Sequence, residues 1–193
     1  MKQFYTLIFL TFGILSLQGQ NTIEWDGVYQ LQLTDFQSPA TKIGEVNIYS
    51  LHTASSFDFA FYMNSIEFMA TKNFNSKVNC YFTRDAASLV APDTLMALDL
   101  LEFARYDFDL SELYARKFRK KMFEEKKGFS GVNFFRPIYD EIQKEYVTKR
   151  TLASQLTDLG RNREILNELH NEVLREIEML ADFCKMCNPK RRK

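Results

Sequence analysis

Residues 100–117 read LLEFARYDFDLSELYARK, and apolar residues recur in and around this stretch every three or four positions. The repeating positions are Leu95, Leu98, Leu101 and Ala104, followed by Leu110, Leu113, Tyr114 and Phe118. This spacing matches the turn of an α-helix. Asp93 is a suitable N-cap and Gly128 a suitable end, so helical structure is predicted between these two residues.

Upstream of this stretch, the hydrophobic pattern changes to the alternation of β-strands. Apolar residues alternate with polar or small ones over 28–33, 57–63 and 78–82. Polar breaks at 37–39, 52–56 and 72–76 supply turns between them. Alternation of this kind is typical of strands with one buried face. The first half of the chain is therefore predicted to form an antiparallel sheet of four or five strands.

Downstream, helical spacing continues to the end of the chain. Residues 129–136 are expected to form a loop, and Pro137 suits the first turn of a helix that runs to about Leu159, where Gly160 interrupts it. The last predicted helix carries an apolar stripe of Leu166, Leu169, Val173, Ile177, Leu180, Cys184 and Cys187. The predicted fold class is therefore α+β, with the sheet first and the helices after it.

The composition is that of a globular protein. The chain has 193 residues, of which 46% are hydrophobic and 15% aromatic, with 25 Lys and Arg against 25 Asp and Glu. A single domain over residues 20–187 is expected at this length. A neutral balance removes the electrostatic argument for a nucleic-acid partner. Glycine is scarce, and neither G-x-G-x-x-G nor G-x-x-x-x-G-K-[ST] occurs, so a nucleotide-phosphate loop is not supported.

Residues 1–19 have the pattern of a signal peptide. Lys2 precedes an apolar run from Tyr5 to Leu17, shorter than the roughly 20 residues that span a bilayer. Leu17-Gln18-Gly19 suits cleavage after Gly19. The mature protein is expected to begin near Gln20, to be periplasmic or extracellular, and to have no stable membrane insertion. A basic tail occupies 188–193.

Three cysteines leave two interpretations open. Cys184 and Cys187 form C-K-M-C near the C-terminus, and Cys80 stands alone. In the first interpretation, Cys184 and Cys187 extend the apolar stripe of the last helix as buried thiols. In the second, they form a disulfide with each other or with Cys80, as an oxidising compartment permits.

Three segments together resemble a known bacterial family. The stretch 100–117 is similar to the helix of the predicted secreted zinc-dependent proteases, which reads approximately L-L-x-H-E-Q-x-H-F-D-I-x-E-L-x-A-R-K. The shared residues are Leu100, Leu101, Phe108, Asp109, Glu112, Leu113, Ala115, Arg116 and Lys117. Residues 31–37 resemble the family's early L-x-W-x-D-F without its tryptophan, and 80–90 resemble the strand and serine turn before the helix. The resemblance implies a zincin-like fold.

The resemblance also implies that the metal site has been lost. In H-E-x-x-H, two histidines on one helical face bind zinc and the glutamate handles the proton of a water. Here the corresponding positions are Phe103, Ala104 and Asp107. A later T-x-H-G of the family matches 157–160, with Leu159 in place of the histidine. No catalytic residue, metal or other cofactor is therefore expected.

Other polar residues have simpler interpretations. Asp109 and Glu112 are expected to orient neighbours or to pair with Arg105 and Arg116 on the helix surface. Glu102 points away from the face of the lost motif and is a poor substitute base. A calcium loop is not supported around Asp107, because Glu112 stands where that loop requires glycine. His52 is expected in a solvated turn and His170 at the edge of the last stripe, and neither Ser88 nor Ser154 has a histidine partner at a recognisable spacing.

The expected function follows from these interpretations. The sequence predicts an exported, catalytically inactive metalloprotease-like protein that binds a peptide or protein in the cell envelope, through β-addition in the groove of an active relative. One alternative is a metal-dependent hydrolase that recruits Asp107, His52 and His170. The other is a structural assembly partner that uses the apolar stripe 166–187 as its interface. No feature of the sequence specifies the partner or the oligomeric state.

Overall fold

The computed structural model describes residues 21–60, 62–131 and 133–189. The predicted signal peptide at 1–19 and residues 190–193 of the basic tail lie outside the described residues. The strands are β1 (Thr22–Glu24), β2 (Lys42–Ile43), β3 (Ser50–His52), β4 (Ser55–Phe59), β5 (Val78–Thr83) and β6 (Ser88–Ala91). The helices are α1 (Ser65–Ala70), α2 (Thr94–Glu125), α3 (Phe135–Thr157) and α4 (Arg163–Met179). Short 3-10 turns are η1 (Leu33–Asp35), η2 (Asn75–Lys77) and η3 (Ala181–Phe183).

The described strands form two sheets of three, so the predicted α+β class is confirmed at this level. The first sheet has the order β1-β5-β4 and is antiparallel throughout. The second has the order β2-β6-β3, in which β2 runs parallel to β6. The described chain thus differs from the expected single antiparallel sheet of four or five strands, because three of its four strand pairings, those of β1, β2 and β3, join segments far apart in sequence.

The predicted strand at 28–33 is wrong, because side chains take the backbone groups that a sheet ladder would use. Oδ1 of Asp26 accepts hydrogen bonds from the backbone N–H groups of Val28 and Tyr29, each at 2.8 Å. The buried Asp35 accepts from the N–H of Gln32 at 2.8 Å. Short polar side chains therefore hold this segment as turns. Within the stretch predicted to be strand-rich, the helix α1 also replaces extended structure, with Asn64 as its N-cap.

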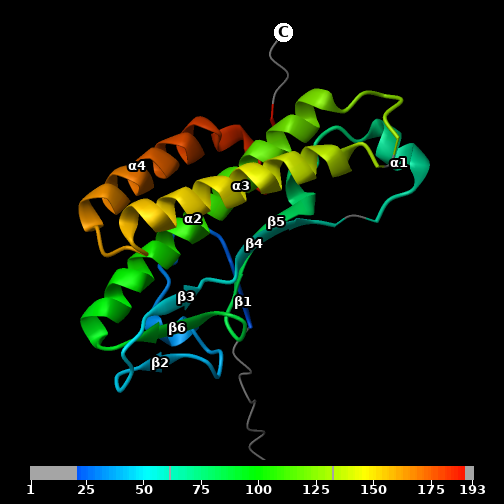
Figure 1. Ribbon diagram of the computed structural model, residues 1–193. Coiled ribbons are helices and arrows are strands. Elements are labelled where there is room, and N and C mark those ends of the chain that lie inside the picture. The colour runs from blue at the N-terminus through cyan, green and yellow to red at the C-terminus, as the bar shows by residue number, and fades with distance from the viewer. Residues whose placement is uncertain (1–20, 61, 132, 190–193) are drawn as a thin grey trace, which may run out of the picture.

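The helix α2 is the centre of the molecule. Asp93 caps it as predicted, with its Oδ1 accepting from the N–H of Met96 at 2.8 Å. Figure 1 shows α3 and α4 on one side of α2 and the strands on the other, and α2 contacts β4, β5 and β6 as well as both helices. Consequently every residue from Leu110 to Arg116 is buried. The predicted apolar face was wrong at its start, since Leu95 is 67% exposed and Leu98 is 40% exposed.

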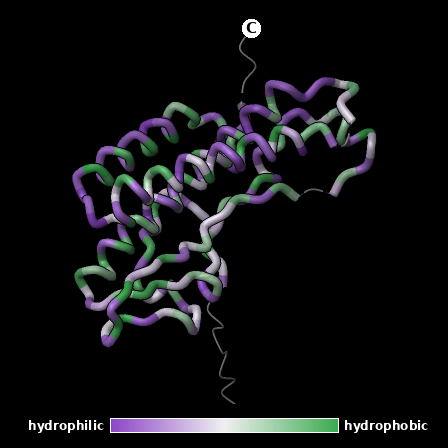
Figure 2. The backbone as a smooth tube through the Cα atoms, in the orientation of Figure 1, coloured by the Kyte–Doolittle hydropathy of each residue, from purple (hydrophilic) through white to green (hydrophobic). Residues whose placement is uncertain are grey.

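The outer helices α3 and α4 are amphipathic, with hydrophilic and hydrophobic residues alternating along their length (Figure 2). The helix α3 begins at Phe135, inside the predicted loop, so Pro137 lies in its first turn. It ends before Gly160, as predicted, because Asp158, Leu159 and Gly160 all have positive φ. The helix α4 buries Leu166, Val173 and Ile177 of its stripe. In the described part of the chain, no helix has the length and apolar character needed to cross a membrane.

The last helix is shorter than predicted, since α4 ends at Met179. The chain then turns through η3 and returns toward α2. Backbone carbonyls in the last turn of α4 and in η3 accept hydrogen bonds from buried arginines of α2: Arg116 donates to the carbonyl of Ile177 at 2.8 Å, and Arg119 donates to that of Phe183 at 3.1 Å. The prediction that Cys184 and Cys187 extend the helical stripe is therefore wrong.

Gly160 offers a test of how closely the turn after α3 packs on α2. A Cβ at this position would overlap the backbone carbonyl oxygen of Asp99, and φ is +99°. We expect Gly160→Ala to lower the free energy of unfolding by at least about 3 kcal/mol, from overlap and left-handed strain together. Gly44 has φ +90° and open space, so Gly44→Ala should cost only about 1–2 kcal/mol. Urea denaturation of both variants checks this, and equal losses would contradict it.

Candidate functional site

The positions that the resemblance aligns with H-E-x-x-H and with the later histidine lie together in the core. Phe103, Ala104 and Asp107 are buried on α2. Leu159 is partly buried against the same core in the turn after α3. The neighbouring Gly160 lies so close to α2 that a Cβ there would be 3.3 Å from the Cβ of Phe103. The structure therefore brings the 157–160 segment beside the helix positions with which the resemblance associated it.

Asp107 is fully buried, and partners from two other segments surround it. Its Oδ1 accepts from the hydroxyl of Tyr146 at 3.0 Å and lies 3.0 Å from Nε of Arg150, both on α3. Its Oδ2 accepts from the hydroxyl of Thr53, in the turn between β3 and β4. Ser111 lies within 3.1 Å of the Tyr146 hydroxyl and completes the cluster. Both carboxylate oxygens of Asp107 are thus engaged.

Burial and the neighbouring groups act in opposite directions on Asp107. Desolvation by burial raises the pKa of its carboxyl, whereas Arg150 and the hydroxyls of Thr53 and Tyr146 lower it. Burial is the largest of these effects, so the pKa lies above its ordinary value. The same burial, together with the Asp107 charge, raises the pKa of Tyr146 well above its usual range. Tyr146 therefore holds its proton and serves as a donor to Asp107.

The residues present do not fit a zinc ion. Phe103, Ala104 and Leu159 have no donor atoms in their side chains, and both oxygens of Asp107 are already engaged. Over the described ranges, no group of three His, Cys, Asp or Glu side chains is placed to share a metal ion. A structural or catalytic zinc site needs at least three such ligands. No step of a reaction can be derived through a metal at these positions.

The two histidines do not join Asp107. His52 is exposed at the end of β3, opposite Ser88, rather than in the predicted turn. His170 on α4 lies with its Nε2 2.7 Å from Oδ2 of Asp109, whose Oδ1 accepts from the indole of Trp25 at 2.7 Å. These contacts give no support to the alternative in which both histidines are recruited to Asp107.

Several simpler interpretations of polar residues can now be compared with the structure. Arg105 pairs with Glu102 at 2.6 Å and also donates to the carbonyl of Leu31. Arg105 therefore forms its ion pair with Glu102 and not with Asp109 or Glu112. The hydroxyl of Ser154 donates to a carbonyl of its own helix, that of Thr151, at 2.8 Å.

The sequence did not predict a second buried charge cluster, which is centred on Glu112. Glu112 does pair with Arg116, at 2.9 Å, but in the core and not on the helix surface. Arg119 adds a contact of 2.8 Å to the same oxygen and donates to the carbonyl of Val78 at 2.9 Å. The spacing of Glu112, Arg116 and Arg119 signals that they share a helical face. The sequence did not indicate that β5 and the segment after α4 cover this face.

The three cysteines form one disulfide and leave one free thiol. Cys184 and Cys187 are bonded to each other, with Cα atoms 5.0 Å apart. The interpretation with an internal disulfide is thus supported over the one with buried stripe thiols. Cys80 is a buried free thiol on β5, and burial raises its pKa well above the ordinary value. It is therefore a poor nucleophile.

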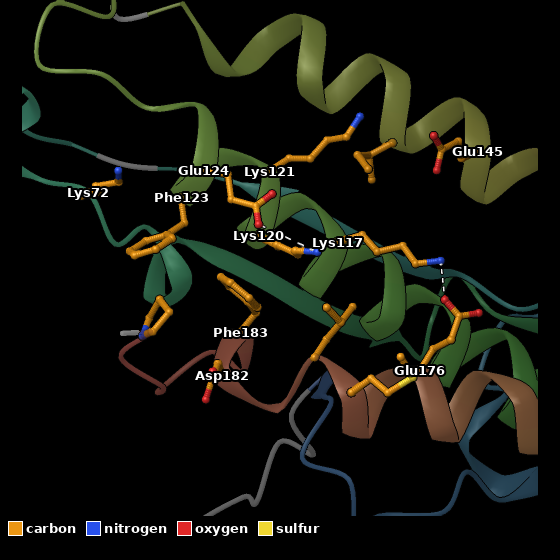
Figure 3. Close-up of a pocket in the computed structure, with 14 residues that line it drawn as sticks. Lys72, Lys117, Lys120, Lys121, Phe123, Glu124, Glu145, Glu176, Asp182 and Phe183 are labelled. Atoms are coloured by element: carbon orange, nitrogen blue, oxygen red, sulfur yellow. Dashed lines mark ion pairs between the residues drawn. The ribbon is translucent and has the colours of Figure 1, made fainter. Parts of the chain in front are cut away.

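A groove of about 920 Å³ lies over the C-terminal half of α2. Figure 3 shows Lys117, Lys120 and Lys121 of α2 between α3, which carries Glu145, and the end of α4. Nζ of Lys117 lies 2.7 Å from a carboxylate oxygen of Glu176. Nζ of Lys120 forms one ion pair with the described residues, at 3.9 Å from a carboxylate oxygen of Glu124. Phe123 and Phe183, in edge-to-face contact, contribute apolar surface. The groove thus combines apolar surface with charged side chains.

The chain matches no protein-family model, no curated protein and no solved structure.

Asp107 gives a prediction with a definite sign. Because its pKa is raised in the folded protein, its stabilising contribution is complete below the unfolded value of 3.8 and is lost as pH rises through the folded value. Asn cannot titrate, so we expect Asp107→Asn to gain stability relative to the wild type as pH rises through this window. Urea midpoints of both proteins at a series of pH values check this. A difference that is constant, or that changes in the opposite direction, would contradict it.

Proposed function

We propose that this is an exported, catalytically inactive metalloprotease-like protein that acts by binding a peptide or protein in the cell envelope. The observation that carries the proposal is the state of three positions on α2. Hydrocarbon fills two of them, Phe103 and Ala104, and the third holds a buried carboxylate that Thr53, Tyr146 and Arg150 already engage. Residues arranged in this way stabilise a core and have no free group with which to activate a water.

The proposed export has support from the disulfide between Cys184 and Cys187. Disulfides persist in oxidising compartments outside the cytosol. The expected signal peptide at 1–19 accounts for how the chain would reach such a compartment.

Binding is proposed at the groove over α2 rather than at a strand edge. Peptide addition to β4 would need its outward backbone groups, and the carbonyl of Phe57 already accepts from the hydroxyl of Tyr139 at 3.1 Å and from the amide of Gln143 at 3.4 Å. The helix α3 therefore covers this edge. The groove beside Lys120 and Phe123 is open, and its mixed lining suits a peptide segment with both apolar and acidic side chains. The assembly alternative loses support, since Leu166, Val173 and Ile177 of the stripe are buried and α4 packs on α2.

Metal content tests the loss of the site. After equilibration of the purified mature chain with zinc and removal of loose metal, we expect less than about a tenth of an equivalent to remain, because fewer than three ligands converge. Metal analysis by mass spectrometry checks this. About one zinc per chain, lost in Asp107→Asn but kept in the wild type, would contradict the proposal and favour a hydrolase.

Peptide selection tests the binding. We expect phage-displayed peptides that are enriched on the immobilised chain to contain acidic and apolar residues, and to bind at least about tenfold more weakly to Lys120→Glu. Lys144 is exposed on α3 and does not line the groove, so Lys144→Glu is the matched control. Titration calorimetry with the enriched peptide measures both. Equal weakening by the two variants, or none by either, would contradict binding in the groove.

A further inference from the structure

A second cavity, of about 640 Å³, opens beside the first strand and has a different character from the groove. It is formed by the chain following β1, by the middle of α2 and by the disulfide segment after α4. Residues that line it include Trp25, Cys80, Arg116, Arg119, Cys184 and Met186. It therefore combines two arginines with an indole ring and sulfur-containing side chains.

The inner end of this cavity carries more positive than negative charge. Arg116 and Arg119 share a single carboxylate, Glu112, whose Oε1 lies 2.9 Å from Nε of Arg116 and 2.8 Å from Nη1 of Arg119. All three residues are buried. Since arginine stays protonated in proteins, two guanidinium charges face one carboxylate. One buried positive charge is left without a counter-charge, which is costly in a protein interior.

The remaining arginine donors are largely directed at neutral acceptors. Arg116 donates from Nη1 to the carbonyl of Ile177 at 2.8 Å, and Arg119 donates from Nη2 to that of Val78 at 2.9 Å. Carbonyl oxygens orient a guanidinium but do not neutralise it. Within the described part of the chain, Nη2 of Arg116 has no acceptor, so a donor remains for a ligand.

The carboxylates at the rim are already engaged. Glu24 pairs with Lys185, and Oδ1 of Asp26 accepts two backbone N–H groups, from Val28 and Tyr29. These hydrogen bonds lower the pKa of Asp26 and keep it ionised at the exposed end. Over the whole lining, Glu24, Asp26 and Glu112 balance Arg116, Arg119 and Lys185, so the positive excess is local to the buried end of the cavity, beside Arg116.

Trp25 forms a fixed apolar wall of the cavity. Its backbone N–H donates to the carbonyl of Cys80 at 3.0 Å, its indole N–H donates to Asp109 at 2.7 Å, and its ring lies 5.4 Å from the guanidinium carbon of Arg116. Gly27, with φ +77°, allows the chain to fold against the indole. Met186, 84% exposed, faces the same cavity across the opening.

We propose that this cavity binds an organic carboxylate, with the carboxylate directed at Arg116 and an apolar body between Trp25 and Met186. A guanidinium that already stacks on an indole presents its remaining N–H edge to a planar carboxylate, which is the geometry arginine favours. A peptide C-terminus and a small free acid carry the same chemistry. The site is independent of the groove of the proposed function, because it is lined by other side chains.

The single tryptophan of the chain is Trp25, so its fluorescence reports on this cavity alone. The probes are N-acetylphenylalanine, its amide, and phenylacetate, each titrated into the full mature chain. We expect saturable changes with the acids and none with the amide. Binding of N-acetylphenylalanine without phenylacetate assigns the site to a peptide C-terminus, and binding of both assigns it to free organic acids. No response to either acid, or an equal response to the amide, would overturn the proposal.

Two variants locate the binding. Arg116→Gln should raise the dissociation constant of the acid about tenfold or more, since a charged hydrogen bond is lost. Because Arg116 is buried and its replacement can impair folding, Met186→Asp provides a second test: it places a negative charge at the exposed rim and should also weaken binding. Met179 is equally exposed at 84% and lines the groove instead, so Met179→Asp is the matched control. Unchanged affinity in Met186→Asp, or equal weakening in the control, would overturn the assignment.

Discussion

Two carboxylates on the buried faces of α2, Asp107 and Glu112, determine how the rest of the chain is arranged around this helix. An ionised group in a protein interior is tolerated only when charged and hydrogen-bonding partners surround it. For Asp107 these partners come from α3 and from the turn before β4. For Glu112 they are Arg116 and Arg119, which in turn donate to carbonyls of β5, of the last turn of α4 and of η3. The helices α3 and α4 and the strand β5 are thereby joined to α2 by polar contacts as well as by apolar packing.

The two clusters differ in how fully their charged groups are enclosed. Around Asp107, neighbouring side chains enclose the carboxylate. The nearby positions Phe103 and Ala104 carry buried apolar side chains, so this part of the helix contributes to the stability of the core. Around Glu112, the arginines outnumber the carboxylate, and the core opens into a cavity. Farther along α2, Lys120 and Phe123 lie in a groove that α3 and α4 flank without covering. One helix thus borders an enclosed polar cluster, a cavity and a groove.

Much of the coarse fold could be predicted because local signals were strong. The cap at Asp93, the break at Gly160 and the strand at 78–82 depend on neighbouring residues and were predicted correctly. The strand at 28–33 could not be predicted from alternation, since Asp26 and Asp35 take its backbone hydrogen bonds. The end of α4 could not be predicted either, because Arg116 and Arg119 hold the chain beyond Met179 through the carbonyls of Leu180 and Phe183.

For the candidate site, the sequence determined which side chains lack an atom that could bind a metal. Phe103, Ala104 and Leu159 have no such atom, whatever surrounds them. Only the tertiary structure decided what Asp107 does, since its partners Thr53 and Arg150 lie more than 40 residues away along the chain. Glu112 has its arginine partners on its own helix, and the tertiary structure decided that this face is buried, with Arg119 donating to the distant carbonyl of Phe183. The tertiary structure likewise decided that Cys184 pairs with Cys187. A side chain's type is a property of the sequence, but its charge balance depends on which distant groups the fold brings within hydrogen-bonding distance.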